Sequence, residues 1–239
     1  MATSVSGVSF ASWASAATQC TNPTFKTAIN RPWSNTSMHR DVLSVLAAVT
    51  KTIKDNGGKE SPSEYYAALL TLMSESSEKA AVAYLLKLTM SKAIQDSLLR
   101  KTFGEAAKTL VKVLSSHSSS TDSSLNKSVL TCLGKLLRAQ SYDSWSTDSV
   151  RHIYRHVLRF VDSEKPSIRR SSHLAVVDIL GSSNVVSLTG DVIFHPACHQ
   201  TQEHLCSVIR QEMSSSVIGT VLSQVARNGQ ERVIAYASR

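Results

Sequence analysis

The chain has 239 residues, of which 42% are hydrophobic and 18% charged, so it can bury the core of one or two domains. Lys and Arg total 26 against 18 Asp and Glu, and the net charge of +8 favours acidic partners such as RNA, DNA or an anionic membrane surface. The 4 cysteines form no Cys-x-x-Cys pair, which argues against a disulfide scaffold. No apolar run approaches the ~20 residues of a membrane helix, and the start lacks the pattern of a signal peptide.

Residues 1–37 show no sustained hydrophobic period, and we expect a flexible or loosely packed segment there. From residue 38 to residue 213, apolar residues recur with the 3.6-residue period of amphipathic helices. The apolar stripes predict helices around 42–53, 65–73, 82–90, 98–114, 125–137, 150–161, 168–180 and 201–213.

Short signals between the stripes predict where helices end and begin. The Gly57-Gly58 pair predicts a helix end, and Ser61-Pro62-Ser63-Glu64 predicts a capped start with proline in the first turn. Gly104 predicts a possible kink, and the Ser-rich stretch 117–124 predicts a loop. Thr147 or Asp148 can cap the helix that follows.

Each stripe is too narrow for a fully buried helix, so successive helices must stack to hide their apolar faces. The sequence therefore predicts an all-α fold of antiparallel helix pairs, stacked as a HEAT/ARM-like α-solenoid over residues 38–213. One segment resembles a HEAT repeat more specifically: Asp162, Pro166 and Ile168-Arg169-Arg170 precede spaced aliphatic residues. In HEAT repeats such a proline starts the second helix, and the Asp and Arg tie neighbouring repeats together.

Several short blocks follow one another in the order and spacing of a known family. They are Cys20-Thr21-Asn22-Pro23-Thr24-Phe25, Val45-Leu46-Ala47-Ala48-Val49-Thr50, Gly57-Gly58-Lys59-Glu60, Glu64-Tyr65-Tyr66-Ala67-Ala68-Leu69, Ala80-Ala81-Val82-Ala83-Tyr84-Leu85-Leu86 and Lys165-Pro166-Ser167-Ile168-Arg169-Arg170. The region from about 18 to 213 thereby resembles the N-terminal part of the ribosomal-RNA-processing protein twelve family.

That resemblance implies a long HEAT-repeat protein of the nucleus and nucleolus, with a role in pre-ribosomal RNA processing and nuclear export of both ribosomal subunits. It implies pre-ribosomal particles, RNA, the Ran GTPase and nucleoporins as partners, with no membrane and no small-molecule substrate. It brings no catalytic residue and no cofactor. Since the family is much longer, we expect a truncated form that lacks part of the binding surface.

The last segment, 214–239, changes character. Val217–Gln224 and Glu231–Ala237 are rich in β-branched residues, and Asn228-Gly229 between them predicts a tight turn of a β-hairpin. The segment resembles the opening hairpin of the ribonuclease H domain of gypsy-type retroelements, but the metal-binding Asp of that motif is absent. Metal-assisted hydrolysis needs a carboxylate cluster, so we expect no nuclease activity, and the tail is a fusion or gene-model artefact or else a native hairpin.

Basic residues gather on one predicted helix and at the start of the next, and they are the candidate RNA- or partner-binding residues: Arg151, Arg155, Arg159, Lys165, Arg169 and Arg170. Such a strip can hold phosphates without reading sequence, but it can equally be a solvated helix face. The chain is therefore predicted to be a non-catalytic scaffold in ribosome assembly. The alternative is a helical-repeat adaptor that binds protein and no RNA.

A group of histidines and cysteines near the C-terminus matches no standard zinc spacing, so no metal site is predicted; its members are His195, Cys198, His199, His204 and Cys206. The sequence holds no nucleophile elbow and no phosphate-binding glycine loop, which leaves no catalytic candidate.

Overall fold

The computed structural model describes residues 19–30, 36–116, 123–182, 195–215, 220–225 and 231–237. The chain divides into two compact units, Met1–His195 and Pro196–Arg239. The boundaries predicted after residues 37 and 213 were drawn from sequence character rather than from contacts, and they stay predictions.

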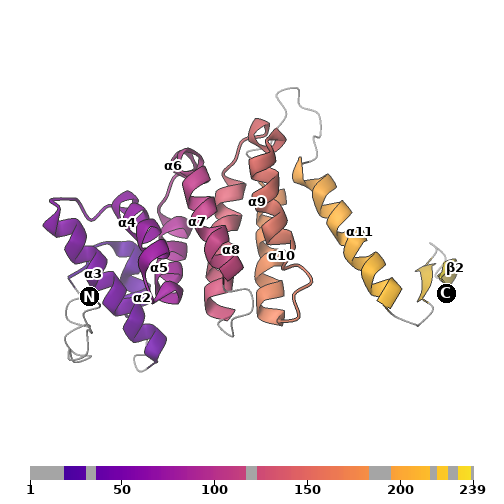
Figure 1. The fold of residues 1–239 in the computed structure, drawn as a ribbon, viewed down its shortest axis with the longest axis horizontal. Helices are drawn as coiled ribbons and strands as arrows, with labels where there is room; N and C mark the ends of the chain where they lie inside the picture. The colour runs from indigo at the N-terminus through magenta and orange to yellow at the C-terminus, as the bar shows by residue number, and fades with distance from the viewer. Residues whose placement is uncertain are drawn as a thin grey trace. The chain divides into compact units, whose positions relative to one another are not determined.

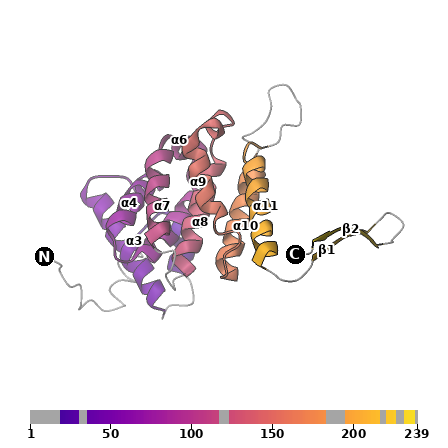
Figure 2. The ribbon, with the colours of Figure 1, turned by 45° about the vertical axis from the view of Figure 1, so that its right-hand side comes forward.

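The first unit is a two-layer stack of helices (Figures 1 and 2). One layer consists of α3 (Ser37–Asp55), α5 (Lys79–Lys92), α8 (Ser123–Arg138) and α10 (Pro166–Leu180). The other consists of α4 (Pro62–Glu75), α7 (Phe103–Ser116) and α9 (Asp148–Leu158). Short elements connect or flank them: η1 (Pro23–Phe25), α2 (Lys26–Ile29), α6 (Asp96–Lys101) and η2 (Asp143–Ser146). Each long helix contacts the next one in its own layer and a partner in the other, so the predicted HEAT-like solenoid is confirmed.

The predicted stop and restart between α3 and α4 are both present. Gly57 has a φ of 70°, and the N–H of Gly58 donates to the Ile53 carbonyl at 2.9 Å, which closes the end of α3. Ser61 Oγ accepts from the N–H of Glu64, and Pro62 is the first residue of α4. The N–H of Ser61 donates to the Lys59 carbonyl, so the capping contact runs from Ser61 to Glu64 without the reciprocal bond of a full capping box.

The stripe around 98–114 forms α6 and α7 rather than one helix with a kink at Gly104. The break lies at Thr102, two residues earlier. Thr102 Oγ1 donates to the Leu98 carbonyl at 2.9 Å and bonds the Tyr66 hydroxyl of α4 at 2.9 Å. A side chain that bonds both its own helix and a neighbouring one ends α6 there, and glycine flexibility is not needed.

Part of the segment expected to be loosely packed is instead packed into the first unit. Phe25 has no exposed surface, and its ring lies edge-on to Tyr65 with 4.8 Å between ring centroids. Asn22 caps η1 by accepting from the N–H of Thr24, and its Nδ2 donates to the Glu60 carbonyl. A lone aromatic residue and a capping turn bury this stretch without any hydrophobic period, so pattern analysis does not detect it.

Glu60 joins this N-terminal stretch to the two helices beside it. Its carboxylate accepts from the Thr21 N–H at 2.7 Å and from the Tyr65 hydroxyl at 3.2 Å, and it pairs with Lys54 at 2.9 Å. Burial opposes ionisation of Glu60, but the Lys54 ammonium and the Thr21 N–H outweigh it and hold the pKa of this carboxyl below its usual value.

Helices α8 and α10 approach each other closely at a glycine. A Cβ on Gly134 would lie 3.0 Å from the Cβ of Ala175, so a larger residue would push the two helices apart by a few tenths of an ångström. Beside this contact, Asp178 of α10 accepts from Lys135 at 2.8 Å and from Arg138 at 2.7 Å, both on α8. These ion pairs connect consecutive repeats.

The HEAT pattern implied that Asp162 and Arg169 connect neighbouring repeats, but within the described part of the chain they do not form that connection. Arg169 Nη1 donates to the Ser163 carbonyl at 2.8 Å, within the turn before its own helix. Asp162 is exposed and forms no ion pair with another of the described residues. Pro166 does begin α10, as the HEAT pattern predicts.

The second unit contains α11 (Ala197–Ser215) and the strands β1 (Thr220–Val225) and β2 (Glu231–Ala237). The strands pair antiparallel, from Thr220 opposite Ala237 to Val225 opposite Glu231, with an irregularity after Leu222. The predicted hairpin strands are therefore present, while the predicted Asn228-Gly229 turn lies outside the described residues.

Two helical glycines offer a matched test of the α8–α10 contact. Gly134→Ala should lower the free energy of unfolding by about 1 kcal/mol, because overpacking of ~1–3 kcal/mol exceeds the gain in helix propensity of ~1 kcal/mol. Gly104 has nothing within 4 Å of its would-be Cβ, so Gly104→Ala should raise stability by about 0.5 kcal/mol. Denaturant unfolding measures both; equal effects would contradict the close approach.

Glu60→Gln should lower the free energy of unfolding by roughly 1–2 kcal/mol at pH 7, because the charge-assisted hydrogen bonds of the carboxylate disappear. A carboxyl with a depressed folded-state pKa stabilises the fold above its unfolded pKa, and this contribution disappears as the pH falls through the folded value. The stabilities of the two proteins should therefore converge progressively as the pH falls below the ordinary glutamate pKa of about 4.3. Glu75→Gln, at the exposed end of α4, is the control, and a difference independent of pH would exclude the ionised Glu60 as the cause.

Candidate nucleic-acid interface

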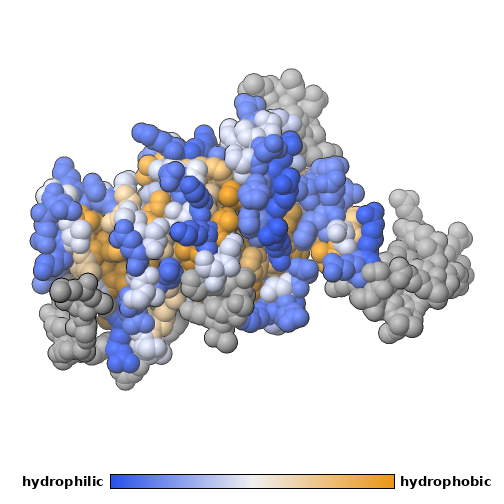
Figure 3. Space-filling model, in the orientation of Figure 1, coloured by the Kyte–Doolittle hydropathy of each residue, from blue (hydrophilic) through white to orange (hydrophobic). Residues whose placement is uncertain are grey.

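Helix α9 separates an apolar face from a basic one. Its buried residues are Val150, Tyr154, Val157 and Leu158. Arg151 and Arg155 lie on the exposed face, and Arg159 is the exposed residue that ends the helix. Hydrophilic residues accordingly cover much of the surface over α9 in the view of Figure 3. Cations at a helix C-terminus also interact favourably with the helix dipole, which suits Arg155 and Arg159.

Lys165, Arg169 and Arg170 lie on the far side of the turn that follows α9, at the start of α10. Lys165 and Arg170 are exposed, whereas Arg169 is half-buried. The turn itself contributes the exposed carboxylates Asp162 and Glu164. The six predicted residues therefore form two basic groups with acidic residues between them in the chain, rather than one uninterrupted strip.

Two of the six side chains donate hydrogen bonds to backbone carbonyls of nearby turns. Arg151 Nε donates to the Trp145 carbonyl at 2.9 Å, and Arg169 donates to the Ser163 carbonyl as described above. Each guanidinium keeps further N–H donors, but its position is set by the turn it supports. Arg155, Arg159 and Arg170 form no ion pair with another of the described residues, which makes these the side chains most available to a phosphate.

Two histidines stand beside the arginines of α9. The Nε2 atoms of His152 and His156 lie 3.3 Å apart, and the rings meet edge-on. Burial lowers the pKa of His156, and the charges of His152 and Arg159 lower it further. The lowered pKa makes His156 a minor contributor to the positive charge of this face near neutral pH.

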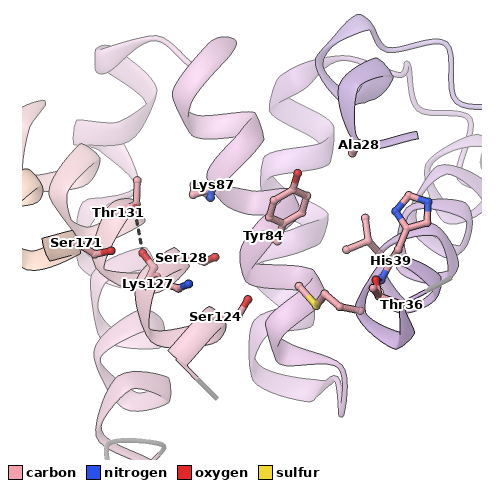
Figure 4. A pocket seen from close by; sticks show the side chains of 12 residues that line it. Ala28, Thr36, His39, Tyr84, Lys87, Ser124, Lys127, Ser128, Thr131 and Ser171 are labelled. Atoms are coloured by element: carbon pink, nitrogen blue, oxygen red, sulfur yellow. Dashed lines mark hydrogen bonds between the residues drawn. The ribbon is translucent and has the colours of Figure 1, made fainter. Parts of the chain in front are cut away.

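A second surface was not anticipated from the sequence. On the α3–α5–α8–α10 layer lies a hollow of about 490 Å³, which receives side chains from helices far apart in the chain (Figure 4). Lys87 and Tyr84 come from α5 and Lys127 from α8, and the Lys87 ammonium lies 5.1 Å from the centroid of the Tyr84 ring. No stripe or spacing brings these residues together before the layer is assembled.

Within the part of the chain that the structure describes, no group of three or more His, Cys, Asp or Glu side chains could hold a metal ion. None of the described helices is long and apolar enough to cross a membrane.

Comparison with known proteins identifies the fold family. Residues 32–216 match the family model described as RRP12-like, N-terminal HEAT repeats. The chain is 36% identical over 207 residues to the RRP12-like protein of Homo sapiens, which covers 85% of this chain and 16% of the human protein. It is 35% identical to that of Gallus gallus over 87% of this chain and 16% of the chicken protein.

The RRP12-like protein of Drosophila melanogaster is 31% identical over 73% of this chain and 13% of the fly protein. The chain thus spans about a sixth of the length of its vertebrate relatives. Since the family match covers most of the chain and coincides with the stacked helices, the chain belongs to the RRP12-like family and carries its N-terminal HEAT repeats.

Proposed function

We propose that the chain is a non-catalytic helical-repeat scaffold in ribosome assembly, which binds pre-ribosomal particles in the nucleus and nucleolus. The observation that carries this proposal is the family match over residues 32–216. The proposal extends to pre-ribosomal RNA processing and to nuclear export of ribosomal subunits, with the Ran GTPase and nucleoporins as further partners. Export and these last partners rest on the family resemblance alone.

The surface chemistry supports the RNA part of the proposal. Arg155, Arg159 and Arg170 are exposed, and the protein has a net charge of +8, which attracts a polyanion over a range set by the ionic strength. Guanidinium groups bind phosphate in a bidentate manner and without reading the base sequence. A scaffold that holds RNA needs this kind of contact.

The competing proposal is an adaptor that binds protein partners and no RNA. It is favoured by the two guanidiniums that brace turns, Arg151 and Arg169, and by the carboxylates Asp162 and Glu164 between the basic groups. The tyrosine that lies between the arginines of α9, Tyr154, is buried, so no exposed Phe, Tyr or Trp side chain stands between them as in single-strand RNA binders.

Affinity purification of the tagged full chain from a nuclear extract tests the proposal at the level of partners. Co-purification of pre-ribosomal RNA with assembly factors is the expected result. Recovery of assembly factors that survives complete RNase treatment, with no RNA contact in crosslinking, would favour the adaptor. Folded, helical protein that recovers neither would contradict a scaffold function for this chain.

The double variant Arg155→Glu/Arg159→Glu should weaken binding of single-stranded RNA roughly tenfold at physiological salt. The slope of log affinity against log salt should become shallower by about 0.7 for each phosphate that the variant no longer neutralises. Both side chains are exposed, so the variant should keep the helical content of the parent protein, with a slightly lower thermal midpoint because two anions then lie at the C-terminus of α9.

Lys108→Glu/Lys112→Glu is the matched control, because it makes the same change in net charge on exposed residues of α7. Equal reductions of RNA affinity in both variants would mean that only the net charge of the protein matters. That outcome would contradict a dedicated site on α9.

A further inference from the structure

The hollow that contains Lys87 and Lys127 continues across α8 to α10. A second hollow, of about 390 Å³, adjoins it, and Thr131 and Ser171 line both. The two hollows adjoin at these residues on the α3–α5–α8–α10 layer, and together they are called here the inner groove. It is a different surface from the basic face of α9, which belongs to the other layer.

The inner groove is positively charged. Its first hollow is lined by Lys87 and Lys127, and no Asp or Glu is among its described lining residues. The second hollow contains the carboxylate of Asp178, which is held by the two cations Lys135 and Arg138. The charge of the first hollow therefore favours an occupant that brings negative charge close to the Lys87 ammonium and the Tyr84 ring.

Two hydroxyl groups of the groove can accept hydrogen bonds from an occupant. Thr131 Oγ1 donates its proton to the Lys127 carbonyl at 2.8 Å, and Ser171 Oγ donates its proton to the Ser167 carbonyl at 3.1 Å. Both oxygens can then only accept further hydrogen bonds, where the hollows meet. The backbone N–H groups of an extended peptide can donate to such acceptors.

Apolar side chains lie at the two ends of the inner groove. Half-buried Met38 and buried Val42 of α3 line the first hollow. Leu174 and Val177 of α10 line the second, with 61% and 67% of their surfaces exposed. Large exposed aliphatic residues next to a cationic centre match a ligand that has apolar residues on both sides of an acidic one.

We propose that the inner groove binds an extended segment of a partner protein, in which acidic residues between apolar ones pair with Lys87 and Lys127. Its backbone N–H groups donate to Thr131 and Ser171, and its apolar side chains cover Met38 and Val42 at one end and Leu174 and Val177 at the other. This peptide site goes beyond the proposed RNA scaffold, since neither RNA nor the arginines of α9 take part in it.

The probe for a direct test is a fluorescein-labelled peptide of about ten residues, with glutamates in the middle and leucines at both ends, since an extended chain advances ~3.3 Å per residue. Fluorescence anisotropy with the full chain should show saturable binding. Lys87→Glu/Lys127→Glu should weaken binding at least about tenfold, because two attractive contacts become repulsive. Lys108→Glu/Lys112→Glu on α7 should leave the affinity unchanged.

Lys87 is half-buried, so two milder variants keep the test valid if the double variant fails to fold. Lys127→Gln removes one charge, and Thr131→Val removes one acceptor at nearly constant shape. Each should weaken binding several-fold at an unchanged thermal midpoint. Unchanged affinity in both would overturn the proposal.

Two further measurements identify the occupant. A peptide with Gln in place of Glu should bind at least about tenfold more weakly, and equal affinity would overturn the pairing with the lysines. Labelled oligouridine should not compete; competition that the Lys87→Glu/Lys127→Glu variant abolishes would overturn the peptide in favour of nucleic acid. Arg155→Glu/Arg159→Glu should lower RNA affinity and spare peptide affinity, so failure of the RNA proposal is distinguishable from failure of this one.

Discussion

The close approach of α8 to α10 at Gly134 is the constraint on which much of the first unit depends. Helix α8 also packs against α5, α7 and α9, so it is the helix through which both layers of the second half are joined. Its burial requires neighbours on several sides, and Leu130, Leu133 and Leu136 have no exposed surface. A narrow apolar stripe is enough when a helix packs against a single neighbour. A helix buried as deeply as α8 needs a small residue at the point where the backbone of a second helix lies close to it.

Hydrophobic periodicity predicted the long helices and the solenoid because a HEAT-like stack repeats one simple relation between neighbours. Pro166 and the Gly57-Gly58 pair placed helix ends correctly, since backbone restrictions act locally. Contacts across repeats were less accessible to sequence. The Thr102 break depends on Tyr66, and the α8–α10 tie depends on Asp178, which differs in no visible way from other charged residues of the chain.

The candidate sites show the same limit. The basic residues of α9 could be found because they recur on one helix, but their separate roles could not. The structure distinguishes Arg151, which braces a turn, from Arg155, which faces solvent. The inner groove could not be found from sequence at all, since Lys87 and Lys127 are 40 positions apart and meet only when α5 and α8 lie side by side. A solenoid generates such surfaces by stacking, which makes them properties of the assembled layer.

The packing of Phe25 against Tyr65 has a consequence for how this domain is delimited. The family match begins at residue 32, yet the stretch from Cys20 to Ile29 contributes a fully buried aromatic ring and bonds to Glu60. A fragment that begins at residue 32 would remove Phe25 from the Tyr65 ring. It would also remove the Thr21 N–H that donates to the Glu60 carboxylate. The stretch 20–29 thus covers the N-terminal end of the helical stack. A fragment made for expression should therefore begin before residue 20.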